Sequence, residues 1–338
     1  MTTTMRAVRL HEIGGPQNLR VDEVPVPQPA AGEVLVRVRA AAFNHRDVFI
    51  TQGKYPGIAL PRILGSDGAG DITALGDSVT SVALGDDVVI DPMLDWGDDP
   101  HVWDAKNSSL LGMPRDGTFA QYVAVPAKNV YPKPKALSWE EAAAIPLAGL
   151  TAYRATFTRG ALKAGETVLI TGVGGGVQTF VLLFAKHAGA RAIVTSGSDE
   201  KLARARELGA DAAYNYKTTP DWHKQVRSEG PVDLVIDSTG GDTLVKAIGA
   251  VRPGGRVAIY GATTGDATIR PFDVFWKHLT IVGTSMGSPQ DFEAMLALFD
   301  DGKLRPAIDK VFPLSDAVAA ATRMDEAAQF GKIVLKID

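Results

Sequence analysis

A glycine-rich turn is the first group of residues in this chain that could hold a reactive ligand. Residues 168–170 have the composition of a short buried strand, the turn Gly172-Val173-Gly174-Gly175-Gly176-Val177 follows, and residues 178–188 carry the apolar stripe of a helix. Glycines let the backbone approach a pyrophosphate, and the N-terminus of the next helix attracts its negative charge. The order of strand, glycine turn and helix therefore predicts the first unit of a dinucleotide-binding fold.

The glycine motif is incomplete, so the prediction of a binding fold also depends on the elements that follow it. Val177 takes the place of the last glycine of G-x-G-x-x-G, and glycines in such a turn can also serve the turn alone. A second unit follows at the expected distance, with a strand over 191–196 and a helix over 199–208 that ends at Gly209. This repetition favours the binding fold over an ordinary tight turn.

The end of the second strand indicates which dinucleotide binds. An NAD site usually places an acid at this strand tip for the ribose 2′-hydroxyl, but the tip here has only small and hydroxyl residues, Thr195 to Ser198. Ser196 and Ser198 can donate hydrogen bonds to a 2′-phosphate, and Lys201 can supply positive charge. Asp199 and Glu200 fit the first turn of the following helix. The sequence therefore predicts NADPH as the cofactor.

The bulk composition limits the class of protein. A chain of 338 residues is long enough for two domains, and a net charge of −4 gives no reason to expect a nucleic-acid or membrane-surface partner. The absence of cysteine excludes disulfides, thiolate nucleophiles and cysteine metal ligands. No apolar segment has the length of a signal peptide or a membrane span. We therefore expect a cytoplasmic protein.

Two kinds of element pattern share the chain. Up to about residue 130, short strands over 5–10, 34–40 and 87–90 predict an all-β, barrel-like domain. From Ser138, whose capping box with Glu141 starts a helix, helical and strand patterns alternate, which predicts a parallel sheet covered by helices. The expected helices cover 151–159, 243–250, 291–301 and 316–325, and the expected strands cover 234–237, 256–260 and 279–283. A last strand over 332–337 is expected to return to the β domain. The expected domains are 1–146 with 288–338, and 147–287.

Several local strings resemble those of a known family. They are Ala42-Phe43-Asn44-His45-Arg46-Asp47, Leu64-Gly65-Ser66-Asp67-Gly68-Ala69-Gly70, Asp116-Gly117-Thr118-Phe119-Ala120-Gln121-Tyr122, Gly149-Leu150-Thr151-Ala152-Tyr153 and Phe330-Gly331-Lys332-Ile333-Val334-Leu335. Together they resemble the medium-chain dehydrogenase/reductase superfamily over nearly the whole chain, and its quinone oxidoreductase-type and zinc-type-dehydrogenase-like members in particular. The resemblance implies an α/β protein, with a Rossmann doubly wound parallel sheet and a GroES-like, β-barrel-type catalytic domain.

The chain departs from that family where zinc enzymes bind their metal. Asn44 stands in the place of a cysteine, Ser66-Asp67 in the place of a histidine–glutamate pair, and Leu147 near the last cysteine. These residues do not supply the tetrahedral donor set that zinc needs, so we expect no metal. The acidic loop 91–104 is either a hard-metal loop or a solvated loop that Trp96 and Trp103 anchor by burial. Its carboxylates lack calcium-loop spacing, which favours the second interpretation.

Without zinc, hydride transfer to an activated acceptor is the expected chemistry. A quinone or an α,β-unsaturated carbonyl spreads the developing negative charge onto oxygen, where hydrogen-bond donors stabilise it and water supplies the proton. The resemblance implies the same activity, with Asn44 facing the nicotinamide and Tyr55 in the substrate cleft. Asp47 is either part of the cleft's hydrogen-bond network or a helix N-terminal acid. A dehydrogenase with a nonstandard metal, and a non-catalytic NADPH-binding sensor or scaffold, remain open.

Further cofactor contacts follow from position in the fold. The tips of parallel strands bind ligands in such sheets, and the resemblance adds Tyr216 near the adenosine phosphate. The expected cofactor-binding residues are Thr151, Gly174, Gly175, Gly176, Val177, Ser196, Ser198, Lys201, Tyr216, Ser238, Gly261, Ala262, Thr263, Gly283, Thr284 and Lys332. The resemblance also implies a homodimer, joined through the apolar edge strand near residues 279–282.

Overall fold

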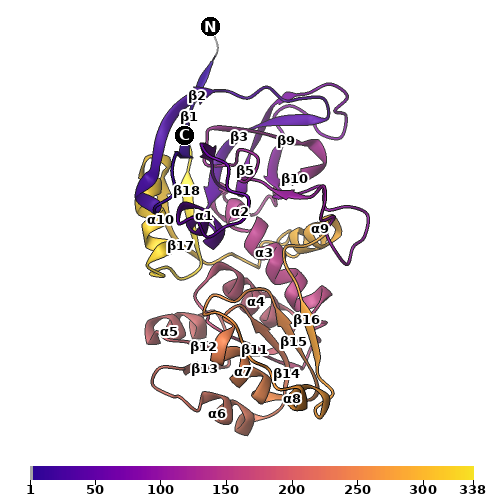
Figure 1. The fold of residues 1–338 in the computed structure, drawn as a ribbon. Coiled ribbons are helices and arrows are strands. Elements are labelled where there is room, and N and C mark those ends of the chain that lie inside the picture. The colour runs from indigo at the N-terminus through magenta and orange to yellow at the C-terminus, as the bar shows by residue number, and fades with distance from the viewer. Residues whose placement is uncertain (1–2) are drawn as a thin grey trace. The chain divides into compact units, whose positions relative to one another are not determined.

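The computed structural model describes residues 3–338 and separates into two compact units (Figure 1). Unit 1 extends to Ala148 and resumes from Ser288 to Asp338, and unit 2 covers Gly149–Gly287. The first junction falls slightly later than the expected 146/147. The reason is local: the backbone N–H of Leu147 donates a hydrogen bond to Asp67 Oδ1 at 2.8 Å, which fixes this segment within unit 1.

Unit 1 is built mainly from antiparallel β-structure. Its largest sheet has the order β10-β6-β5-β3-β18-β17, and β9 also pairs with β3. These strands are β10 (Val130–Pro132), β6 (Asp87–Ile90), β5 (Asp67–Leu75), β3 (Glu33–Ala42), β18 (Lys332–Lys336), β17 (Ile308–Pro313) and β9 (Tyr122–Pro126). A second sheet joins β2 (Leu19–Pro25), β1 (Thr4–Leu10) and β4 (Arg62–Ile63), and a third joins β7 (Met93–Leu94) to β8 (Ser109–Leu110). The helices are α1 (His45–Thr51), α2 (Trp139–Ala144), α9 (Pro289–Ala297) and α10 (Ala317–Asp325).

The C-terminal strand returns to the β domain, which confirms the prediction. β18 lies antiparallel to β3, with Leu335 opposite Ala41, and parallel to β17. Because Val334 lies opposite Ala42, the start of β18 is set beside the end of β3. This register places the start of the C-terminal strand beside the residues that follow β3, where Phe43 N donates to the carbonyl oxygen of Ile333 at 2.9 Å.

Unit 2 is a parallel α/β sheet with the strand order β13-β12-β11-β14-β15-β16. The strands are β11 (Thr167–Ile170), β12 (Arg191–Ser196), β13 (Ala212–Asn215), β14 (Val232–Asp237), β15 (Val251–Ile259) and β16 (Thr280–Gly283). The intervening helices are α4 (Gly176–His187), α5 (Asp199–Glu207), α6 (Trp222–Glu229), α7 (Gly241–Ala250) and α8 (Pro271–Phe275). Strand order reverses at β11, and such reversals mark the ligand crevice of open α/β sheets.

Burial explains why the strands of unit 2 have nearly continuous apolar sequences. Every residue of β11 is buried, and Val168, Leu169 and Ile170 have no exposed surface. A strand covered on both faces needs apolar side chains at successive positions, not at alternate ones. In unit 1, buried and partly buried residues alternate more clearly along a strand. Arg37 and Arg39 of β3 are only partly buried, and both donate hydrogen bonds to Asp71.

Two helices differ most from their expected ranges. The helix expected over 151–159 is α3 (Pro146–Tyr153) followed by a π-helical segment, Arg154–Thr158. The helix expected over 291–301 is α9, which begins earlier because Ser288 caps it: its Oγ accepts from Asp291 N, and Asp291 Oδ2 accepts from Ser288 N. α9 ends at Ala297, and turns continue to residue 302.

Candidate functional site

Three elements of unit 1 bring the predicted catalytic residue Asn44 into a buried polar network. Asn44 follows β3 and precedes α1, Asp67 begins β5 directly opposite Ala42, and Lys332 begins β18. The backbone of Asn44 is fixed by Asp47, whose Oδ2 accepts a hydrogen bond from Asn44 N at 2.8 Å. The helix start therefore orients the Asn44 side chain toward the strands.

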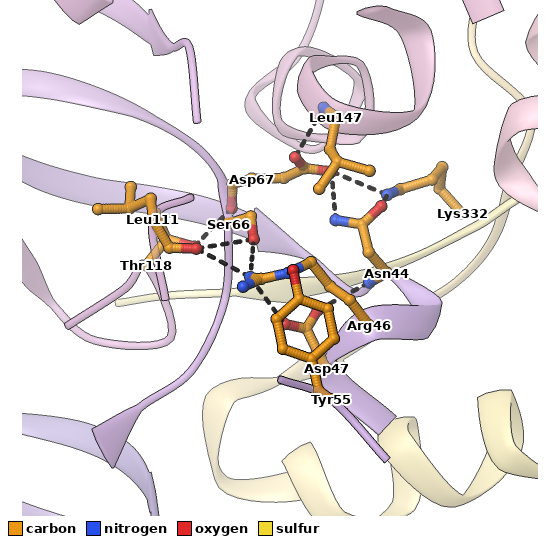
Figure 2. Close-up of polar contacts among 10 residues, drawn as sticks. All are labelled: Asn44, Arg46, Asp47, Tyr55, Ser66, Asp67, Leu111, Thr118, Leu147 and Lys332. Atoms are coloured by element: carbon orange, nitrogen blue, oxygen red, sulfur yellow. Dashed lines mark hydrogen bonds and ion pairs between the residues drawn. The ribbon is translucent and has the colours of Figure 1, made fainter. Parts of the chain in front are cut away.

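The first half of the network pairs a buried lysine with a buried aspartate (Figure 2). Lys332 Nζ donates to Asp67 Oδ2 at 2.8 Å and to Asn44 Oδ1 at 2.7 Å. Asn44 Nδ2 also donates to Asp67 Oδ2, at 3.0 Å. Lys332 is 1% exposed and Asp67 is 0% exposed. Ions so deeply buried persist only with close partners, and each of these two ions has more than one.

The second half of the network is centred on Arg46 of α1 (Figure 2). Arg46 Nη1 donates to Ser66 Oγ at 2.5 Å and to the carbonyl oxygen of Leu111 at 2.9 Å. Arg46 Nε donates to the hydroxyl oxygen of Tyr55 at 3.3 Å, and the guanidinium carbon lies 4.8 Å from the centre of the Tyr55 ring. Arg46 Nη2 is buried and has no partner among residues 3–338. The guanidinium is thus held through Nε and Nη1, and the protons of Nη2 remain available for hydrogen bonds.

Asp47 lies beside this guanidinium and is itself buried. Burial raises the pKa of Asp47 to about 6, although the positive charge of Arg46 acts in the opposite direction. Its Oδ1 lies 4.0 Å from Arg46 Nη1 and has no hydrogen-bond partner among the described residues. Asp47 therefore serves the start of α1 and also the charge balance of the network.

The residues in the positions that the resemblance assigns to zinc offer few metal donors. Asn44 supplies an amide, Ser66 a hydroxyl engaged by Arg46, and Leu147 an apolar side chain. Asp67 alone offers a carboxylate, and Lys332 and Asn44 donate to it. Zinc requires several nitrogen, thiolate or carboxylate donors in a tetrahedral set. In the part of the chain that the structure describes, no three histidine, aspartate or glutamate side chains gather as a metal site would require.

The acidic loop 91–104 is held by turns. Asp104 Oδ1 accepts from the backbone N–H of Lys106, and Asp99 Oδ1 accepts from that of His101. Trp96 is 3% exposed and donates from Nε1 to the carbonyl oxygen of Asp99. Trp103 is 41% exposed, so the expectation that both tryptophans anchor the loop by burial was wrong for Trp103.

In unit 2, the predicted glycine turn joins β11 to α4. Gly172 and Gly174 have φ of 66° and 131°, conformations that side chains disfavour. A methyl group on Gly174 would come 2.7 Å from Lys201 Cδ, so this lysine side chain lies across the turn. Because α4 begins at Gly176, the turn also presents a helix N-terminus. These features fit a dinucleotide pyrophosphate.

The second strand tip gathers the residues predicted to hold a 2′-phosphate. Ser196 ends β12, and Ser198 caps α5 by accepting from Lys201 N at 3.3 Å. Asp199 turns aside, since its carboxylate accepts from Asn215 Nδ2 at 2.8 Å. A methyl group on Gly197 would come 2.8 Å from both Tyr216 Oη and Lys217 Cε. The sequence reasoning missed Lys217, although its place directly after Tyr216 was a usable signal.

The remaining predicted cofactor residues follow the other strand ends. Gln178 Nε2 donates to Ser238 Oγ at 2.6 Å, and Thr263 N donates to the carbonyl oxygen of Ser238 at 3.0 Å. This edge of unit 2 carries Gly175, Val177, Ser238, Gly261, Ala262, Thr263, Gly283 and Thr284. Thr151 lies in α3, with its hydroxyl 4.0 Å from Met286 Sδ. Lys332 lies in unit 1 and already donates to Asp67 and Asn44, so its cofactor contact stays a prediction.

The fold and the two sets of residues define a nicotinamide-dependent oxidoreductase, and comparison with known proteins identifies the family. Residues 30–135 match the alcohol dehydrogenase GroES-like domain, and residues 176–301 match the zinc-binding dehydrogenase family. The chain belongs to the medium-chain dehydrogenase/reductase superfamily. No helix in residues 3–338 is both long and apolar enough to cross a membrane.

Individual relatives differ in the activities that their names state. The chain is 37% identical to the zinc-type alcohol dehydrogenase-like protein YogA of Leptosphaeria maculans, over 94% of both chains. It is 31% identical to the quinone oxidoreductase of Homo sapiens, over 94% of this chain and 92% of the relative. A crystal structure of an NAD-dependent alcohol dehydrogenase is 41% identical, with a TM-score of 0.93, over 99% of this chain and 100% of the other.

Proposed function

We propose that this protein is a zinc-independent, NADPH-dependent reductase of quinones or α,β-unsaturated carbonyls. The observation that carries the proposal is the hydrogen-bonded network at the family's zinc positions. There Asn44 and Asp67 are engaged with the ammonium of Lys332, and Ser66 is engaged with Arg46. Without a Lewis acid, an acceptor that spreads charge onto its own oxygen is the easiest to reduce.

The choice of NADPH rests on the second strand tip of unit 2. Ser196 and Ser198 offer hydroxyls, Lys217 offers positive charge beside Gly197, and Lys201 offers positive charge beside Gly174. An acid directed at the ribose 2′-hydroxyl is not among these groups, because Asp199 bonds Asn215. Some relatives are named NAD-dependent dehydrogenases, so selectivity between the two cofactors is the property to measure.

The roles of the chain's own residues follow from their bonding. The bound cofactor supplies a hydride to the acceptor. The glycine turn and the α4 N-terminus hold the pyrophosphate, and the strand ends orient the rest of the nucleotide. In unit 1, Asn44 is held by Asp67 and Lys332, and Tyr55 presents a half-buried hydroxyl beside Arg46. These fixed donors stabilise negative charge on the acceptor, and water provides the proton.

The proposal extends to a homodimer through β16, with a cytoplasmic location as expected from the sequence. β16 is an edge strand of the unit 2 sheet, bonded only to β15. Phe272, Phe275 and Trp276, in and just after α8, are 53%, 61% and 68% exposed, and exposed aromatic clusters mark interaction surfaces. Sedimentation equilibrium tests this: a dimer that Trp276→Glu converts to a monomer supports it, and a monomeric wild type contradicts it.

Steady-state kinetics tests the proposed activity. Oxidation of NADPH and of NADH is followed at neutral pH with 1,4-benzoquinone and with a simple enone, before and after chelator treatment. Turnover that survives the chelator and prefers NADPH supports the proposal. Activity only with alcohols and only with metal present favours an alcohol dehydrogenase, and tight NADPH binding without turnover favours a non-catalytic sensor.

A further inference from the structure

Arg46 is the member of the network that has a buried donor without an acceptor among the described residues. Its Nη1 has two acceptors, the Ser66 hydroxyl and the Leu111 carbonyl, and its Nε reaches the Tyr55 hydroxyl. Its Nη2 is buried with no partner among residues 3–338. A buried donor without an acceptor costs free energy, and a catalytic role is one of the reasons for which native structures keep such groups.

The surroundings of Arg46 fix its direction and preserve its charge. Ser66 donates its own proton to the Leu111 carbonyl at 2.9 Å, which leaves the Ser66 oxygen free to accept from Arg46. The ring of Tyr55 lies against the guanidinium, and the half-buried Tyr55 is the part of this group that meets solvent. Because the Tyr55 oxygen accepts from Arg46 Nε, its own O–H proton can point to another acceptor.

We propose that Arg46 Nη2 and the Tyr55 hydroxyl together bind the acceptor oxygen on which negative charge develops, making Arg46 a catalytic residue. This inference rests on the reductase function proposed above. As hydride adds to the β-carbon of an enone, the π electron pair moves onto the carbonyl oxygen, and two donors receive the resulting oxyanion. When hydride adds to one oxygen of a quinone, the same negative charge develops on the other oxygen. Arginine keeps its protons, so the proton that completes the product comes from water.

The same geometry defines the preferred substrate class. A guanidinium edge beside a phenol hydroxyl suits a planar conjugated carbonyl, whose oxygen can lie in the plane of the guanidinium while its ring lies near Tyr55. In a saturated ketone of the same size, hydride must add to the carbonyl carbon itself, and the charge stays on a single alkoxide oxygen without conjugation. We therefore expect enones and quinones to be reduced far faster than their saturated analogues.

The test uses variants at Arg46 and a ligand whose ionisation is visible. The variants are Arg46→Gln, Arg46→Lys and Tyr55→Phe, with Lys54→Gln as the control, because Lys54 is an exposed cation next to Tyr55 on the same loop. 4-Nitrophenol absorbs at longer wavelength as the phenolate, and the phenolate resembles the charged acceptor. Its binding to the NADP⁺ complex is titrated by absorbance, alongside kcat and KM for benzoquinone.

The expected outcomes separate binding of the oxyanion from overall stability. Wild type and Lys54→Gln bind the phenolate form, Arg46→Gln loses that selectivity and about 10²–10³-fold in kcat, and Arg46→Lys recovers part of both. NADPH affinity stays unchanged in every variant. Arg46→Gln that keeps phenolate binding and kcat within about twofold overturns the proposal.

Two further outcomes keep the test decisive. If Arg46→Gln does not fold, Tyr55→Phe retains the ring and must still weaken phenolate binding; unchanged binding overturns the proposal. If wild type reduces neither acceptor, the proposed function fails. The phenolate titration then still judges Arg46 separately, because it needs no turnover.

Discussion

The two ligand-binding regions of this protein are built in different ways. The edge of unit 2 offers backbone groups, a helix N-terminus and strand ends, and the side chains of Lys201 and Lys217 lie beside its glycines Gly174 and Gly197. The network of unit 1 consists of buried side chains, with Lys332, Asp67, Arg46 and Asp47 all less than a tenth exposed. Backbone sites spread their binding over many groups, whereas each buried charge depends on a few close partners. Substitutions should therefore act on affinity in unit 2 and on stability in unit 1.

The largest effect is expected from breaking the Lys332–Asp67 pair. Asp67→Asn removes the carboxylate and leaves a buried ammonium, which should lower the free energy of unfolding by about 3–5 kcal/mol. Urea denaturation measures the loss. The control is Asp221→Asn, which breaks an ion pair of unit 2 whose side chains are both 65% exposed and should cost under about 1 kcal/mol. Equal losses of unfolding free energy in the two variants would show that the buried pair of unit 1 matters no more for stability than the exposed pair of unit 2.

Substitution of Asp91 should raise the stability of the protein at high pH, in contrast to the loss expected for Asp67→Asn. The buried carboxylate of Asp91 accepts a hydrogen bond from Met93 N, and burial raises the pKa of Asp91 to about 7. The folded protein therefore holds a proton there that the unfolded chain loses near pH 4, so stability falls as pH rises from about 4 to 7. Asp91→Asn should flatten this fall and add on the order of 2 kcal/mol at pH 8. Thermal denaturation at pH 5 and pH 8 measures it; an unchanged pH profile would contradict the shifted pKa.

In unit 2, a side chain in the glycine turn should weaken cofactor binding without unfolding the protein. Gly174 has a φ of 131°, and an added methyl group would meet Lys201 Cδ at 2.7 Å. Gly174→Ala should raise the Kd for NADPH by about 10²-fold, measured by fluorescence titration. Gly249→Ala is the matched control, because a methyl group at Gly249 would meet its nearest neighbour, His223, only at 4.0 Å. Full affinity in Gly174→Ala would argue against a pyrophosphate at this turn.

The smallest effects concern selectivity between cofactors. Lys201→Gln and Lys217→Gln should each raise the KM for NADPH about tenfold while leaving that for NADH nearly unchanged, because only NADPH carries the 2′-phosphate. The exposed Lys224, which pairs with Asp221, supplies the control Lys224→Gln. A parallel change in both cofactors would place these lysines away from the 2′-phosphate.

The contrast between the backbone-based site of unit 2 and the side-chain network of unit 1 also explains which features could be predicted from the sequence. Local patterns located the glycine turn, β12 at its observed bounds and the capping box at Ser138, since each depends on residues close in sequence. The returning strand β18 was also predicted, but its register was not. Register decides that Lys332 bonds Asn44 across 288 positions. No local pattern signals this contact.

Arg46 shows the second limit. Arginine is seldom buried, so a sequence gives no reason to place Arg46 inside a domain, whereas its neighbours Asn44 and Asp47 are predicted site residues. Its burial depends on Ser66 and on the Leu111 carbonyl, which lie on segments distant in sequence. Motifs that use the backbone can be recognised from sequence, whereas a network of buried side chains needs the fold.

We propose that fixed hydrogen-bond donors, and no bound zinc, support reduction at the family's zinc positions. The most direct test is the rate of NADPH-dependent 1,4-benzoquinone reduction by chelator-stripped protein, measured while Zn²⁺ is added back. We expect full turnover in the stripped protein and no increase with zinc. Loss of turnover on stripping, restored by one equivalent of zinc per chain, would contradict the account.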